Sequence, residues 1–104
     1  METSKFLVYY QDANYDDPFT PEQISEYTKG HIDHLRDMDS TGILFFCGLL
    51  KGDEKGMLIL NAKTQEEAEG HVLRDPFIAN KCYKTYLIYE IAEANAGNNF
   101  LSDT

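Results

Sequence analysis

Basic residues and long apolar runs are scarce in this chain, and each scarcity excludes a class of function. Lys and Arg number 9 against 18 Asp and Glu, so the formal net charge of the 104 residues is −9. Nucleic acids and anionic membrane surfaces require clustered basic side chains, so neither is an expected partner. No apolar run approaches the roughly 20 residues that cross a bilayer, and the first residues do not resemble a signal peptide. We therefore expect a cytoplasmic protein.

The chain has only two cysteines and no recognisable cofactor-binding motif. Cys47 lies within an apolar run and Cys82 lies just before one, and neither belongs to a C-x-x-C or Cys/His metal pattern. Phosphate-binding glycine loops, dinucleotide fingerprints and the nucleophile elbow of serine hydrolases are also absent. The sequence predicts two buried, reduced thiols. We expect no cofactor and no bound metal.

The order of apolar runs, amphipathic stretches and turn residues predicts four strands and two helices. Apolar, β-prone runs bounded by turn residues are typical of strands, and apolar residues recurring every three to four positions are typical of helices. The strands are expected at residues 6–10, 43–50, 57–60 and 83–91, and the helices from 21 to about 41 and from 65 to about 74. A turn cluster at 51–56 predicts that the second and third strands form a hairpin.

Capping residues indicate where each helix begins. Residues 20–23 (Thr-Pro-Glu-Gln) are typical of a capping box with proline at the first helical position, and residues 64–67 (Thr-Gln-Glu-Glu) form a second capping box. Asp75 before Pro76 predicts the N-cap of one more short helical turn. Gly42 is suited to end the first helix.

The resulting order βαββαβ predicts one α+β domain with the ferredoxin-like arrangement. Right-handed crossovers then place four antiparallel strands in one sheet with both helices on one face. We assign residues 1–91 to this domain. Residues 92–104 form a polar C-terminal tail that is expected to be partly disordered or to dock on a partner subunit.

The strands are more apolar than a single protomer requires. A sheet with one wet face should alternate apolar and polar residues, but residues 6–9, 43–47 and 86–89 are apolar on both faces. Two helices cover one face, and the other would expose more apolar surface than soluble monomers usually tolerate. The sequence therefore predicts a homodimer in which two sheets pack face to face.

His31 and Asp75 are the candidate catalytic residues. His31 lies in the middle of the apolar stripe of the first helix, and Asp75 lies at the break after the second. Imidazole suits proton transfer at neutral pH, and a nearby carboxylate selects one ring tautomer. One oxygen of Asp75 can cap the short turn while the other meets the imidazole. The two helices lie side by side in this fold, so the contact is geometrically possible; a core histidine bonded to backbone is the structural alternative.

Several short motifs, taken in order, resemble one family. They are the aromatic-polar-Asp segment at 9–12, His31 followed by Leu35, Gly42 and Gly48, the helix start at 64–68, and the Asp-Pro-Phe turn at 75–77. Together they resemble the YciI-like (YCII-related) family of the dimeric α+β barrel superfamily over residues 5–91. The resemblance implies a small homodimer whose His31–Asp75 pair performs cofactor-free acid–base chemistry on a small organic molecule. Elimination, dehydrochlorination and isomerisation of ring compounds are the reactions it implies.

Further residues are candidates for the walls of a substrate pocket. The loop at 11–19 is placed to rim such a pocket, and a Tyr side chain presents an apolar body with a polar tip. The candidates are Tyr9, Asp12, Tyr15, Tyr27 and His34.

Two other functions stay open. The chain could be a non-catalytic module that binds a small molecule or another protein, with a structural His–Asp pair. It could also be a metal-dependent enzyme in which His31 and His34 ligate an ion, with Asp75 or His71 as the third ligand.

Overall fold

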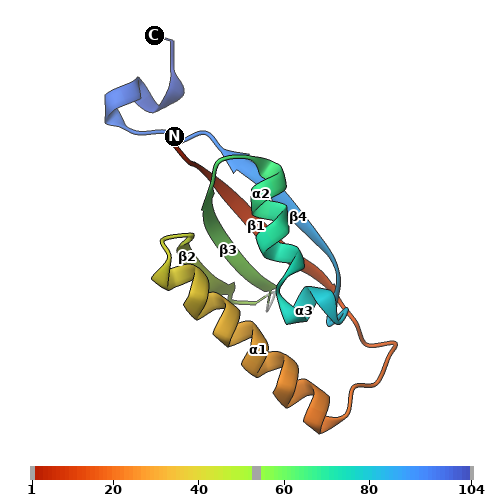
Figure 1. Cartoon of the computed structure of the whole chain (residues 1–104). Helices are drawn as coiled ribbons and strands as arrows, with labels where there is room; N and C mark the ends of the chain where they lie inside the picture. The colour runs from red at the N-terminus through yellow and green to blue at the C-terminus, as the bar shows by residue number, and fades with distance from the viewer. Residues whose placement is uncertain (1, 53–54, 104) are drawn as a thin grey trace.

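A four-stranded antiparallel sheet forms the centre of the computed structural model, which describes residues 2–52 and 55–103. The strands are β1 (Ser4–Ala13), β2 (Leu44–Leu50), β3 (Lys55–Ala62) and β4 (Tyr83–Ile91), in the order β2-β3-β1-β4. Helices α1 (Pro21–Ser40), α2 (Gln65–Leu73) and the short α3 (Pro76–Ala79) cover one face of the sheet (Figure 1). A 3-10 segment, η1 (Ala96–Leu101), follows β4. The predicted ferredoxin-like α+β fold is confirmed.

The predicted strands match in place but differ in length. β4 spans the predicted residues, whereas β1 continues beyond Tyr10 because Gln11 pairs with Thr85 and Ala13 pairs with Tyr83. β2 and β3 form the predicted hairpin, and β3 is longer at both ends than expected. Cross-strand hydrogen bonds therefore extend the sheet into segments whose polar residues are typical of loops. No helix among the described residues is both long and apolar enough to cross a membrane.

The helix caps largely follow the sequence. Thr20 and Gln23 form the reciprocal capping box, and Gly42 takes a positive φ of 79° just after α1. Thr64 accepts the backbone N–H of Glu67 as an N-cap should. The Glu67 carboxylate, however, accepts the N–H of Lys63 rather than that of Thr64. This differs from the reciprocal bond of a capping box.

The core lies between the sheet and the helices. Alternate residues of β1 point into it, and Phe6 and Val8 are fully buried while their neighbours are partly exposed. Burying one such side chain contributes about 1.5–3 kcal/mol relative to leaving it in water. The core is completed from β3 and the helices by Met38, Leu58, Leu60, Ala62, Ala68, Val72 and Ile78.

The opposite face of the sheet is apolar and uncovered. Leu7 lies across from Ile59 on one side and Tyr89 on the other, so these three side chains share that face. Phe46 also pairs with Ile59, and Phe46 and Tyr89 are 55% and 52% exposed. Neither described helices nor described strands pack on this surface (Figure 1). We call it the open sheet face.

The prediction of two buried thiols is wrong for Cys47. Its side chain is exposed, and Cys82 is half-buried; both are free cysteines. β2 is an edge strand, and its residues from Phe45 onwards are exposed although they are apolar. An apolar run at a sheet edge does not by itself produce burial.

Gly30 allows α1 to approach α3 closely. A Cβ atom at this position would lie 2.8 Å from Cγ of Pro76, which is too close for two carbon atoms. The missing side chain thus lets the middle of α1 pack directly on the start of α3. His31 directly follows Gly30, and Asp75 directly precedes Pro76. The close packing of Gly30 on Pro76 therefore brings His31 and Asp75 together.

We expect Gly30→Ala to lower the free energy of unfolding by about 1–3 kcal/mol, because the new methyl group overpacks the α1–α3 contact. Gly70→Ala in α2 is the matched control. Its Cβ would meet Nη1 of Arg74 at an ordinary 3.5 Å, so the better helix propensity should stabilise the protein by up to about 1 kcal/mol. Urea unfolding measures both values. Equal stability of the two variants would contradict the close α1–α3 contact.

Candidate active site

Asp75 is the N-cap of α3 and is fully buried. Its extended backbone and the following Pro76 are typical of an N-cap and first helical position, as predicted. Oδ1 of Asp75 accepts the backbone N–H of Phe77 at 2.9 Å. The side chain of Asn80 closes the other end of this short helix by donating to the carbonyl of Pro76. Local capping therefore fixes the carboxylate at the point where α3 meets α1 and β1.

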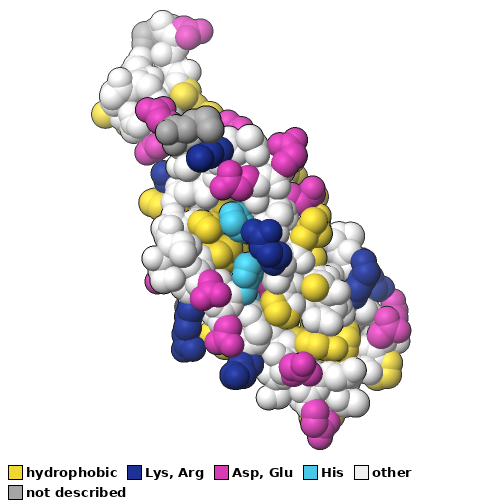
Figure 2. All heavy atoms as spheres, viewed as in Figure 1, with side chains coloured by type: hydrophobic (Ala, Val, Ile, Leu, Met, Phe, Trp, Pro, Cys, Tyr) yellow, Lys and Arg dark blue, Asp and Glu magenta, His cyan; other side chains and the backbone are white. Residues whose placement is uncertain are grey.

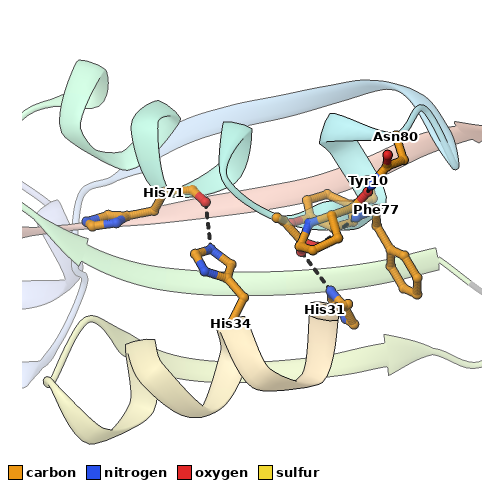
Figure 3. A network of polar contacts seen from close by, with 8 residues as sticks. Tyr10, His31, His34, His71, Phe77 and Asn80 are labelled. Carbon is orange, nitrogen blue, oxygen red and sulfur yellow. Dashed lines mark hydrogen bonds and ion pairs between the residues drawn. The ribbon is translucent and has the colours of Figure 1, made fainter. Parts of the chain in front are cut away.

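The second oxygen of Asp75, Oδ2, is hydrogen-bonded to two side chains from other elements. Nδ1 of His31 in α1 lies 2.7 Å from Oδ2, and the hydroxyl of Tyr10 in β1 donates to the same oxygen at 2.5 Å. Figure 3 shows His31 and Tyr10 converging below α3 from the helix and from the sheet. Three donors thus surround one carboxylate with no exposed surface. A buried charge needs such partners to offset the loss of its hydration.

The charges of this group follow from its contacts. Burial disfavours the charged form of Asp75, but hydrogen bonds from His31, Tyr10 and Phe77 outweigh it and hold the carboxyl pKa below its ordinary value. Burial, together with the charge and hydrogen bond of Asp75, raises the pKa of Tyr10 far above its ordinary value. At neutral pH Asp75 is therefore a carboxylate and Tyr10 is a neutral donor.

The imidazole of His31 is held in a defined orientation. A carboxylate oxygen accepts hydrogen bonds, so Nδ1 carries the proton and Nε2 is the basic nitrogen. The ring of Phe77 stacks on the imidazole, with ring centroids 4.1 Å apart and planes at 15°. The His31 side chain is 18% exposed. This arrangement leaves Nε2 to accept a proton from a bound molecule.

A cavity of about 230 Å³ lies beside His31 between α1 and the sheet. A cavity of about 150 Å³ is sufficient to hold benzene. The space therefore suits one substituted ring, which we call the His31 cavity. Its walls are apolar and aromatic apart from a few polar groups, and they are formed by Tyr10, His31, Leu35, Cys47, Gly48, Leu49, Gly56, Met57, Leu58, Phe77 and Tyr83.

The five candidate pocket residues from the sequence lie in different places. Tyr9 points to the open sheet face, where it pairs with Met57 and Leu87. Asp12 is exposed at the end of β1. Tyr15 and Tyr27 line a second cavity next to the His31 cavity.

His34 and His71 join α1 to α2. Nε2 of His34 donates to the backbone carbonyl of His71 at 2.7 Å, and Nδ1 of His71 accepts from Arg74 at the same distance. Figure 2 shows the histidine side chains at the seam between α1 and the other two helices. In residues 2–52 and 55–103, no group of three or more His, Cys, Asp or Glu side chains is placed to hold a metal ion.

Two residues of this site were not expected from the sequence. Tyr10 follows the candidate Tyr9 on β1, and neighbours on one strand face opposite sides of the sheet, so the sequence did not show which of the two meets Asp75. In the sequence, Phe77 stands out only as part of the Asp-Pro-Phe turn. An aromatic residue two positions after a capping Asp, on a one-turn helix, is the signal that could have placed a ring beside the carboxylate.

Comparison with known proteins identifies the family. A model described as the YCII-related domain matches residues 5–92. The chain belongs to the YCII-related family. This confirms the resemblance that the short motifs indicated, and the matched region agrees closely with the predicted one. No curated protein matches the chain in sequence.

A solved structure of similar fold adds to this result. It is the 5-chloro-2-hydroxyhydroquinone dehydrochlorinase of Burkholderia phenoliruptrix, in complex with 2,5-dihydroxybenzoquinone. The TM-score is 0.65 at 17% sequence identity, over 91% of this chain and 99% of that chain. At this identity the likeness shows the fold.

Proposed function

We propose that this YCII-related protein catalyses proton transfer on a small ring compound, with His31 as general acid and base. The observation that carries the proposal is the 2.7 Å contact between Nδ1 of His31 and the buried carboxylate of Asp75, beside a cavity of the size of one ring. Asp75 orients the imidazole and stabilises the imidazolium that forms when Nε2 takes a proton. Side chains of this chain supply the base, so the reaction requires no cofactor for the proton transfer.

The chemistry is elimination or isomerisation. In an elimination, Nε2 removes a proton from the ring compound, the electron pair forms a new double bond, and the leaving group departs with its own pair. For a chlorinated ring the departing groups are a proton and chloride, which is dehydrochlorination. In an isomerisation, His31 returns the proton to another atom of the ring. A positioned base of this kind contributes about 10²–10⁴-fold to the rate.

The structural neighbour supports the class of substrate. That protein is a dehydrochlorinase of a hydroxylated chlorinated ring, and its bound molecule is a single-ring quinone. The His31 cavity has room for such a ring, and its aromatic walls provide faces for stacking. We therefore propose hydroxylated or chlorinated aromatic compounds as the substrates of this chain.

We expect His31→Asn to lower turnover by about 10²–10⁴-fold while the protein stays folded. A panel of chlorinated dihydroxybenzenes and trihydroxybenzenes is the assay, with chloride release and ring absorbance as readouts and circular dichroism as the test of folding. Asp33→Asn, on the exposed face of the same helix, is the matched control and should keep full activity. Retained turnover in His31→Asn, or a wild-type protein inactive on the whole panel, would contradict the proposal.

We also propose that two copies of the chain pair through their open sheet faces. Leu7 is at the centre of this face, and the exposed fractions of Phe45 and Phe46 are 58% and 55%. Such a contiguous apolar surface is typical of an interface. The segment after Ile91 extends beyond the sheet in Figure 1, and its docking on the partner subunit stays a prediction.

We expect Leu7→Glu to convert a dimer into a monomer, because it places a charge at the centre of the open sheet face. Light scattering during gel filtration should give twice the chain mass of 11.9 kDa for the wild type and the single mass for the variant. Ile32→Glu, at a 41% exposed apolar residue of α1, is the control and should stay dimeric. A monomeric wild type or a dimeric Leu7→Glu would contradict the proposed pairing.

A further inference from the structure

A second cavity, of about 210 Å³, lies next to the His31 cavity. It is bounded by the loop after β1, the first turns of α1, and the segment from α3 to β4. Half of the residues that line it are aromatic, and the full set is Ala13, Asn14, Tyr15, Phe19, Ile24, Tyr27, Thr28, Phe77, Cys82 and Tyr83. We call it the aromatic cavity. Figure 2 shows apolar side chains, with acidic ones among them, at the end of the molecule where α1 begins.

Two pairs of aromatic rings lie in the walls of the aromatic cavity, and the rings of each pair meet at a different angle. Phe19 and Tyr27 meet edge to face, with centroids 5.8 Å apart and planes at 89°. Phe77 and Tyr83 lie 6.0 Å apart at 58° on the α3 and β4 side. Phe77 and Tyr83 also line the His31 cavity, so they border both spaces. The rings that line the aromatic cavity therefore lie at different angles to one another.

The polar groups of this cavity do not provide a site for an anion. The polar atoms of the Asn14 side chain are already hydrogen-bonded: its oxygen accepts the N–H groups of Asp16 and Asp17, and its nitrogen donates to Asp17 and to the carbonyl of Lys81. Burial, and next the neighbouring Tyr15, raise the pKa of the Tyr83 phenol, so this hydroxyl stays neutral. No lining residue carries a formal charge at neutral pH.

The charges around the cavity favour a cation. Asp12 lies at the end of β1, and Asp16 and Asp17 lie in the loop that follows. Lys84 forms an ion pair with Asp16 and lies within the field of the other two carboxylates. One ammonium group faces three carboxylates, so this cluster has an excess of negative charge. The whole chain has a net charge of −9, which acts in the same direction.

We propose that the aromatic cavity binds a small organic cation, of the alkylammonium or quaternary ammonium class, against the faces of Phe19, Tyr27 and Tyr83. Ring faces attract such cations through the aromatic quadrupole, and a cation of this class has methyl groups that suit apolar walls. The carboxylates of the loop add a long-range attraction without direct contact. This site shares Tyr83 with the wall of the His31 cavity, but the proposal does not rest on proton transfer by His31.

A pair of probes of equal shape tests the role of charge. Choline has a positively charged quaternary nitrogen at the position where the neutral 3,3-dimethyl-1-butanol has a quaternary carbon. Binding of each probe to the wild-type protein is measured by calorimetry and by shifts of the aromatic proton resonances. We expect choline to bind about 10-fold more tightly, in line with the energy of a cation–π contact. Equal affinity for the two probes, or no saturable binding of choline, would overturn the proposal.

Matched ring deletions locate the site. Phe19→Leu keeps an apolar side chain and removes one ring, and we expect it to weaken choline binding several-fold with little change for the neutral probe. Phe100→Leu makes the same chemical change at a 67% exposed residue of η1 and should have no effect. Tyr15→Leu repeats the test at another lining ring, whose side chain is 91% exposed, so we expect this variant to stay folded. Unchanged choline binding in both Phe19→Leu and Tyr15→Leu would overturn the assignment.

Discussion

The buried carboxylate of Asp75 is the interaction on which the candidate site depends. A charge with no exposed surface is stable only when hydrogen bonds replace its lost hydration. In this chain the donors come from β1, α1 and the first turn of α3. The carboxylate therefore fixes the relative positions of sheet and helices, and the same contacts orient the imidazole of His31. One oxygen of this side chain caps α3, and the other contacts both Tyr10 and His31.

Close packing makes this arrangement possible. An isolated helix of four residues is not stable, because a single turn fixes several dihedral angles for few hydrogen bonds. α3 persists since Asp75 caps it and α1 packs against it at Gly30 and Pro76. The same contact places Phe77 on the imidazole plane. His31 thus has one ring nitrogen and one ring face in contact with the first residues of α3.

The sequence predicted what local chemistry decides. The capping box at Thr20, the Asp75 cap and the limits of β4 each depend on neighbours in the chain, and the structure agrees with them. From the residues alone the meeting of His31 with Asp75 was only geometrically possible, since it depends on how two helices pack, and the family resemblance implied the pair. The hydrogen bond from Tyr10 to Asp75 was not predicted. The alternation of side chains along a strand separates them onto two faces of the sheet, but it does not show which face the helices cover. The exposure of Cys47 follows from strand order, which an apolar run does not reveal.

The tautomer of His31 tests the central claim most directly. A long-range proton–nitrogen correlation spectrum of the histidine side chains distinguishes the two neutral forms of each ring. The account predicts that neutral His31 is protonated at Nδ1, with a proton resonance shifted far downfield by the contact with Asp75, and that Asp75→Asn removes this signal. Protonation of neutral His31 mainly at Nε2 would contradict it, because the nitrogen left for the substrate would then carry no free electron pair.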